Sequence, residues 1–77
     1  MKIETHGANK TEVNLNDGTL IFFSYQTPVA GRDKQGFFRT DKKWSVTTSK
    51  HINQWLDIYH ADARIVGQNW IDSLLDK

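Results

Sequence analysis

Residues 11–25, TEVNLNDGTLIFFSY, carry the clearest structural signal in the chain. Val13 and Leu15 alternate with polar residues, as in a strand that buries one face. The Asn-Asp-Gly that follows tolerates the positive φ angles of a tight turn. Residues 19–25 come next and are rich in residues that favour strands. The stretch therefore predicts an antiparallel hairpin.

The second strand of this hairpin is apolar on both faces. Leu20 and Phe22 fall on one face, whereas Ile21, Phe23 and Tyr25 fall on the other. Such a strand is usually covered on both sides, so we expect it at the centre of the sheet or with one face in an interface. If both helices of so short a chain pack on the same side, we expect a symmetric homodimer with the aromatic strand face as its seam.

The chain after the hairpin predicts further short strands and a loop. Pro28 cannot donate to a ladder, so residues 27–30, TPVA, are expected to form a bend or an edge. Residues 31–36, GRDKQG, are typical of a polar loop between two glycines. Residues 37–40, FFRT, and 44–47, WSVT, then predict two short strands.

The period of the apolar residues changes at Thr48. Four large side chains follow at the i, i+3, i+4, i+7 spacing of one buried helical stripe. We therefore predict a helix over residues 48–59, with Thr48 as the N-cap whose side-chain oxygen satisfies a free backbone amide. The stripe consists of Ile52, Trp55, Leu56 and Tyr59.

These elements predict an α+β fold in one domain over residues 1–77. We expect a small antiparallel β-sheet of three to five strands between about residues 11 and 47. One amphipathic helix packs on this sheet, and a short C-terminal helix follows Gly67 or Gln68 after an extended RIV segment. Residues 1–10 are expected to be flexible or to add a short edge strand through their KIE segment.

Composition excludes several classes of protein. The chain has no cysteine, so disulfides and thiolate zinc sites are absent, which fits a reducing compartment. The longest apolar run, LIFF, is far shorter than the ~20 residues of a membrane span. The N-terminus lacks the apolar region of a signal peptide. We expect a soluble intracellular protein that does not enter a membrane.

The middle of the chain is basic although the net charge is only +1. Between Arg32 and Lys50, six bases face two acids, and aromatic residues are interleaved with them. This pattern indicates either a footprint for an anionic partner or an ordinary solvated loop, and both interpretations stay open. The candidate binding residues are Arg32, Lys34, Phe37, Arg39, Lys42, Lys43, Lys50 and His51.

Catalytic and metal chemistry find little support. Residues 47–50, TTSK, are explained by helix capping; the alternative, phosphate binding, lacks a glycine-rich loop. Ser49 and His51 are two residues apart and cannot face each other on a helix. The three histidines and the nearby aspartates lack the i, i+4 spacing of a helical metal site. We expect no enzymatic activity, no metal and no cofactor. The side chains considered as metal ligands are His6, His51, His60, Asp57 and Asp62.

Residues 22–56 resemble a family of small uncharacterised proteins common in bacteriophage and viral genomes. The recurring segments are aromatic-Ser-Tyr, Thr-Pro-Val-Ala, Arg-Thr, aromatic-Ser-Val-Thr-Thr and His-Ile-Asn-x-Trp-Leu, in this order. The resemblance implies no activity, because it points to a domain of unknown function. It implies a phage-encoded accessory protein made in the cytoplasm of the host cell.

Two functions remain as hypotheses. The first is a protein-binding module that modulates a host or phage protein through exposed aromatic side chains, which are common interface anchors. The second is a nucleic-acid-binding module that uses residues 32–50, with Phe37, Phe38 or Trp44 as a stacking platform.

Overall fold

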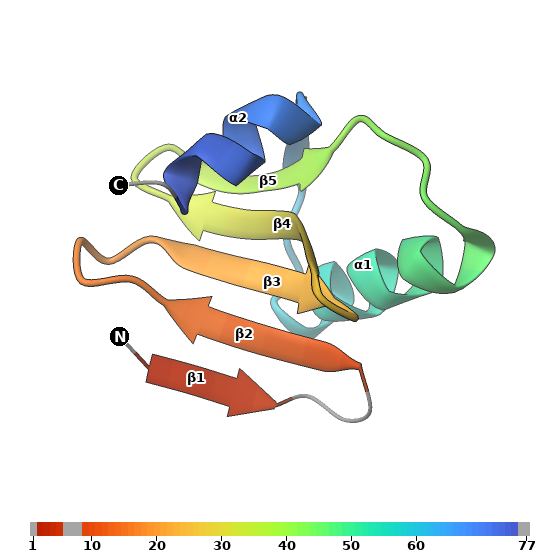
Figure 1. Ribbon diagram of the computed structural model, residues 1–77, viewed down its shortest axis with the longest axis horizontal. Helices are drawn as coiled ribbons and strands as arrows, with labels where there is room; N and C mark the ends of the chain where they lie inside the picture. Colours follow the sequence, from red (N-terminus) through yellow and green to blue (C-terminus); the bar gives the residue numbers. More distant parts are fainter. Residues whose placement is uncertain (1, 6–8, 76–77) are drawn as a thin grey trace.

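The computed structural model describes residues 2–5 and 9–75 (Figure 1). These residues form a sheet and two helices, which confirms the predicted α+β fold. The elements are β1 (Lys2–Thr5), β2 (Lys10–Asn14), β3 (Leu20–Ser24), β4 (Thr27–Asp33), β5 (Gly36–Thr40), α1 (Val46–Ile58), β6 (Ala63–Val66) and α2 (Gln68–Leu74).

The six strands lie side by side in the order of the sequence. The first five form an antiparallel meander, and β6 pairs with β5 in parallel. Parallel pairing is possible because α1 crosses over between these two strands. β1 contains the KIE segment that was a candidate edge strand, and β6 contains the extended RIV segment. The expectation for residues 1 and 6–8 lies outside the described residues.

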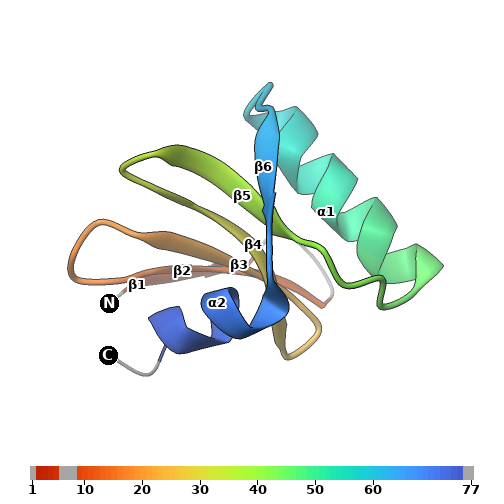
Figure 2. The ribbon, with the colours of Figure 1, turned by 90° about the horizontal axis from the view of Figure 1, so that it is seen from above.

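The two helices lie on opposite faces of the sheet (Figure 2). Side chains that alternate along β3 therefore enter two separate cores, as its two apolar faces predicted. The premise of the homodimer argument, that both helices pack on one side, is wrong. The core under α1 contains Leu20, Phe22, Val29, Ala30, Ile52, Trp55 and Leu56, and the core under α2 contains Ile21, Phe38 and Ile71.

Strand β4 corrects the prediction of a bend and a polar loop. Pro28 lies near the start of the strand, opposite a register shift between Phe22 and Phe23, and proline is tolerated at such irregularities. Gly31 is a buried strand residue rather than the start of a loop. A Cβ atom there would lie 2.3 Å from the carbonyl oxygen of Leu20. The loop shrinks to a two-residue turn between β4 and β5.

The start of α1 corrects two further predictions. The strand predicted over residues 44–47 does not form: residues 41–45 are a loop, and the helix begins at Val46. The N-cap is Ser45, whose Oγ accepts a hydrogen bond from the Thr48 amide at 3.1 Å. Thr48, the predicted cap, lies inside the first turn and is buried. Ser45 and Thr48 both carry a hydroxyl that can cap a helix. Ser45 is the cap because its backbone is extended, whereas Thr48 is already helical.

The predicted helical stripe holds α1 on the sheet. Trp55 is 1% exposed and stacks on Phe22 with ring centroids 5.0 Å apart. Its indole N–H donates to Oε1 of Glu12 at 2.9 Å, and the Tyr59 hydroxyl donates to the same oxygen. Glu12 is buried in β2, and these hydrogen bonds compensate the burial of its side chain. The stripe is therefore apolar in its middle and polar toward the end of the helix.

Candidate binding groove

The basic residues of the middle segment lie at both ends of the β4–β5 hairpin. Arg32 and Lys34 lie beside its turn, and the Arg32 guanidinium is 5.9 Å from the centre of the Phe37 ring. Lys42 and Lys43 belong to the loop that leaves β5 and enters α1. The basic candidate residues are therefore close in sequence but lie in two separate places on the molecule.

Most of the candidate stacking aromatics belong to the cores. Phe38 is fully buried and contacts the Trp70 ring edge to face at 4.9 Å. Phe37 is half-buried, with its ring centroid 5.5 Å from that of Trp55. Trp44 remains exposed, and the Lys42 ammonium lies 4.0 Å from the centre of its ring. Trp44 is thus the most exposed member of the predicted trio.

His51 makes a polar link between α1 and the sheet. Its Nδ1 lies 2.8 Å from the hydroxyl of Ser24, which in turn lies 3.3 Å from the Thr48 hydroxyl. Burial, followed by the nearby Lys10 charge, lowers the pKa of His51 below its usual value. Ser24 is only 1% exposed, so a substrate cannot reach it as a nucleophile. The pair serves structure, and sequence analysis missed it because 27 residues separate its members.

Two adjoining hollows lie between α1 and the strands β5 and β6. The hollow beside the first turns of α1 has a volume of about 490 Å³, and the one beside its last turns has about 430 Å³. Arg39 and Ala63 line both hollows, which therefore adjoin and together make up one surface region beside β6. We call it the α1–β6 groove.

The groove has opposite charges at its two ends. Lys42 and Lys43 line the end beside the start of α1, where Asp41 offsets one of their charges. Asp57 and Asp62 line the other end. Ionic side chains at such positions select the orientation of a charged partner.

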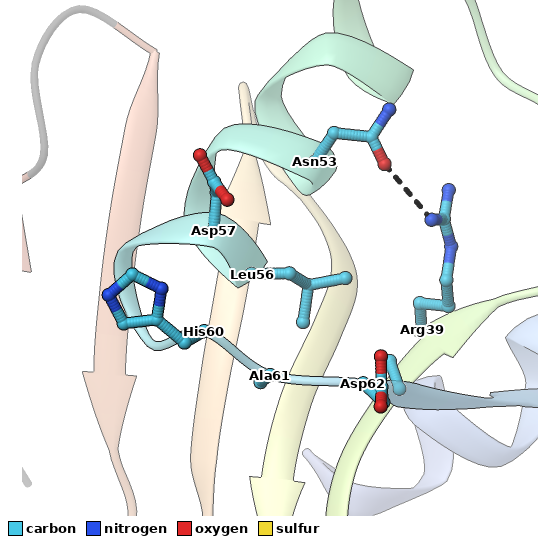
Figure 3. A pocket seen from close by; sticks show the side chains of 8 residues that line it. Arg39, Asn53, Leu56, Asp57, His60, Ala61 and Asp62 are labelled. Carbon is cyan, nitrogen blue, oxygen red and sulfur yellow. Dashed lines mark hydrogen bonds between the residues drawn. The ribbon is translucent and has the colours of Figure 1, made fainter.

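Arg39 marks the middle of the groove. Figure 3 shows its side chain reaching from β5 toward Asn53 on α1, and its Nη1 donates to the Asn53 Oδ1 at 3.1 Å. Asp57 and His60 extend from the helix side, and Asp62 lies on the segment that leads into β6 (Figure 3). The hydrogen bond holds the guanidinium in place at the point where the two hollows meet.

Apolar side chains line the basic half of the groove. Ile65 on β6 is 70% exposed and Trp44 is 41% exposed, and both belong to the wall of this half. Sequence analysis missed Ile65, Asp57 and Asp62 as site residues. No local signal marks them, because Asp57 lies on α1 and the other two follow it, so they line the groove only once α1 returns the chain to the edge of the sheet.

Strand β6 is fixed from the face opposite the groove. Arg64 donates to Oδ2 of Asp33 at 2.7 Å and to the Gly36 carbonyl at 3.3 Å. Its guanidinium also lies 5.6 Å from the ring centres of Phe38 and Trp70. Burial alone would raise the pKa of Asp33, but the hydrogen bonds from Arg64 and the Gln35 amide and the charge of Arg64 outweigh it and lower the pKa. These contacts hold the edge strand in position on the sheet.

The remaining candidate residues lie elsewhere. Lys50 is exposed on α1 and, like His51, is not among the side chains that line the groove. Over residues 2–5 and 9–75, no cluster of three or more histidine and acidic side chains is suited to a metal ion. His6 lies outside the part of the chain that the structure describes. Neither helix in that part is long and apolar enough to span a membrane.

Fold and groove together define a small α+β domain with an open sheet edge beside an amphipathic helix. The chain belongs to a family of unknown function, DUF8033, whose model matches residues 1–73. Comparisons with curated proteins and with solved structures gave no match. The resemblance to a domain of unknown function is thereby confirmed.

Proposed function

We propose that this domain binds a partner protein through the α1–β6 groove. One observation carries the proposal: the groove combines exposed apolar side chains, Ile65 and Trp44, with opposite charges at its two ends. Protein interfaces typically combine apolar or aromatic anchors with a polar rim. The charges then orient the partner and exclude unsuitable ones.

The same observations favour a protein over a nucleic acid. A single-strand binder needs exposed rings beside a continuous basic path, whereas Phe37 and Phe38 pack into the cores. Asp41, Asp57 and Asp62 also line the groove, where they would repel phosphates.

The biological setting follows from the resemblance of residues 22–56 to phage proteins. In this proposal the domain is a phage-encoded accessory protein in the cytoplasm of the host cell. It acts without chemistry of its own, by occupying a surface of a host or phage protein and so modulating that protein.

The test compares two charge-matched double variants as baits in lysate of infected host cells. Lys42→Glu with Lys43→Glu alters the basic end of the groove, and Arg32→Glu with Lys34→Glu alters exposed residues beside the β4–β5 turn. We expect the wild-type chain and the turn variant to retain the same protein, and the groove variant to retain about tenfold less. Thermal melts confirm that all three baits are folded.

Two results would contradict the proposal. Equal retention by both double variants would place the interaction outside the groove. A retained species that disappears after nuclease treatment would favour the nucleic-acid hypothesis, whose binding should also fall steeply with salt.

A further inference from the structure

We infer that the partner presents an extended segment that adds to β6 as a seventh strand, antiparallel to it. The segment has acidic residues first, β-branched residues in the middle and basic residues last. This inference rests on the proposed function and specifies the chemistry that the groove recognises.

The open edge of the sheet provides the backbone contacts. β6 ends the strand order and pairs only with β5 among the described strands. Its sequence, ARIV, contains no proline, and the alternate amides that point away from β5 face this edge. Figure 2 looks onto this edge and shows β6 between α1 and α2. Exposed strand edges of this kind accept extended peptides through main-chain hydrogen bonds.

The edge strand is also preorganised. Arg64 fixes β6 from the opposite face through Asp33, Gly36 and two aromatic rings. Little conformational entropy is then lost from the domain when a peptide pairs with the strand, which increases affinity. The ordering cost falls mainly on the partner segment.

The strand direction and the charges of the groove together set the order of charged residues in the partner. β6 begins directly after Asp62, and it ends at Val66, whose carbonyl accepts from the Asp41 amide next to Lys42. The strand therefore runs from the acidic end of the groove to the basic end. An antiparallel segment starts at the basic end, and antiparallel pairs are the more stable. Acidic residues consequently come first in the partner, and basic residues follow after about four positions, the length of β6.

The apolar side chains set the middle of the segment. Ile65 pairs with Arg39, so it lies on the groove side of β6 and is 70% exposed. A cross-strand neighbour lies about 5 Å away and packs against such a side chain. β-branched residues at alternate positions would cover Ile65 and reach the exposed ring of Trp44.

The experiment selects binders to the full chain from a random twelve-residue peptide library. We expect the selected peptides to share the order acidic, β-branched, basic. Their affinity, measured by fluorescence anisotropy, should fall about tenfold or more on Ile65→Lys. Ile3→Lys is the matched control, because Ile3 is also an exposed strand isoleucine, at 61%, on the opposite edge strand β1. Its effect should stay within about twofold.

Backbone methylation separates strand addition from side-chain docking. Two versions of the best peptide carry N-methyl groups on its odd or its even residues. An added strand donates alternate amides, so one version should lose about tenfold or more and the other should bind nearly as well as the parent. Equal affinity of both versions, peptides without the shared charge order, unchanged affinity for Ile65→Lys, or a library without binders would overturn the inference. Capture of the natural partner that depends on Lys42 and Lys43 would still uphold the proposed function.

Discussion

Trp55 joins the helix to the sheet through both an apolar and a polar contact. It lies at the centre of the core under α1 and donates to the buried Glu12. Trp55→Ala should cost about 3–5 kcal/mol, a large fraction of the stability of so small a domain, and leave the chain largely unfolded at 25 °C. Chemical denaturation followed by circular dichroism measures this loss. A variant that unfolds at the wild-type midpoint would show that the stripe does not hold the fold.

His51 gives the fold a dependence on pH. Its pKa is lowered in the folded state, so the unfolded chain binds more protons as the pH falls through about 6.5. Stability that is present above this value is therefore lost on acidification, until the pH passes below the folded pKa. The urea midpoint should be lower at pH 5.5 than at pH 7.5. His51→Gln should reduce this difference, and a variant that keeps the full wild-type pH dependence would contradict the assignment.

Single residues were predictable where a local pattern marks them. The burial of Trp55 follows from helical spacing and is confirmed. The partners Ser24 for His51 and Glu12 for Trp55 were not, because they are 27 and 43 residues away and depend on which strand lies under α1. The spacing of residues along the sequence does not show which strand residues lie opposite a given helix residue.

At the scale of elements, the first turn of α1 depends on its cap. Ser45→Ala removes the acceptor of the Thr48 amide and should cost about 1 kcal/mol. Thr47→Ala is the control, because Thr47 is exposed in the same turn; it should cost only a few tenths of a kcal/mol. Denaturation midpoints of the two variants measure the difference. A larger loss for Thr47→Ala would contradict the assignment of the cap.

Elements with a strong periodic pattern were predicted, and those with mixed signals were not. The hairpin and the helical stripe follow from alternation and from 3.6-residue spacing. β4 was missed because Pro28 and Gly31 usually interrupt strands; here a register shift accompanies the first, and close packing against Leu20 requires the second. The sequence of residues 44–47 is typical of a strand. In the structure, residues 44 and 45 end the loop before α1, and residues 46 and 47 begin the helix.

At the scale of the whole molecule, the opposite placement of the helices changes the expected assembly. β3 is covered on both faces, and the hollow left beside Ile3, Phe23 and Tyr25 has a volume of only about 280 Å³. We therefore predict a monomer. Light scattering at micromolar concentration should give 8.9 kDa, unchanged on dilution. Twice that mass would contradict this prediction and favour the homodimer that the aromatic strand face first suggested.

The groove is the part of the molecule that the sequence predicted least. Arg39, Lys42 and Lys43 were candidates because of the basic segment, and they do line it. Arg32, Lys34 and Lys50 belonged to the same segment and lie outside it. Asp57 lies on α1, and Asp62 and Ile65 follow it, so the crossover of α1 and the parallel pairing of β5 and β6 bring the two halves together.

Photo-crosslinking tests the central claim, that the α1–β6 groove binds a protein, most directly. Benzoylphenylalanine replaces either Ile65 in the groove or Ile3 on the opposite edge strand, both of which are exposed. Irradiation in infected host cells should join the chain to one discrete protein from position 65, and the product should resist nuclease and be absent from position 3. Crosslinks of the same pattern and yield from both positions, or none from position 65, would contradict the claim.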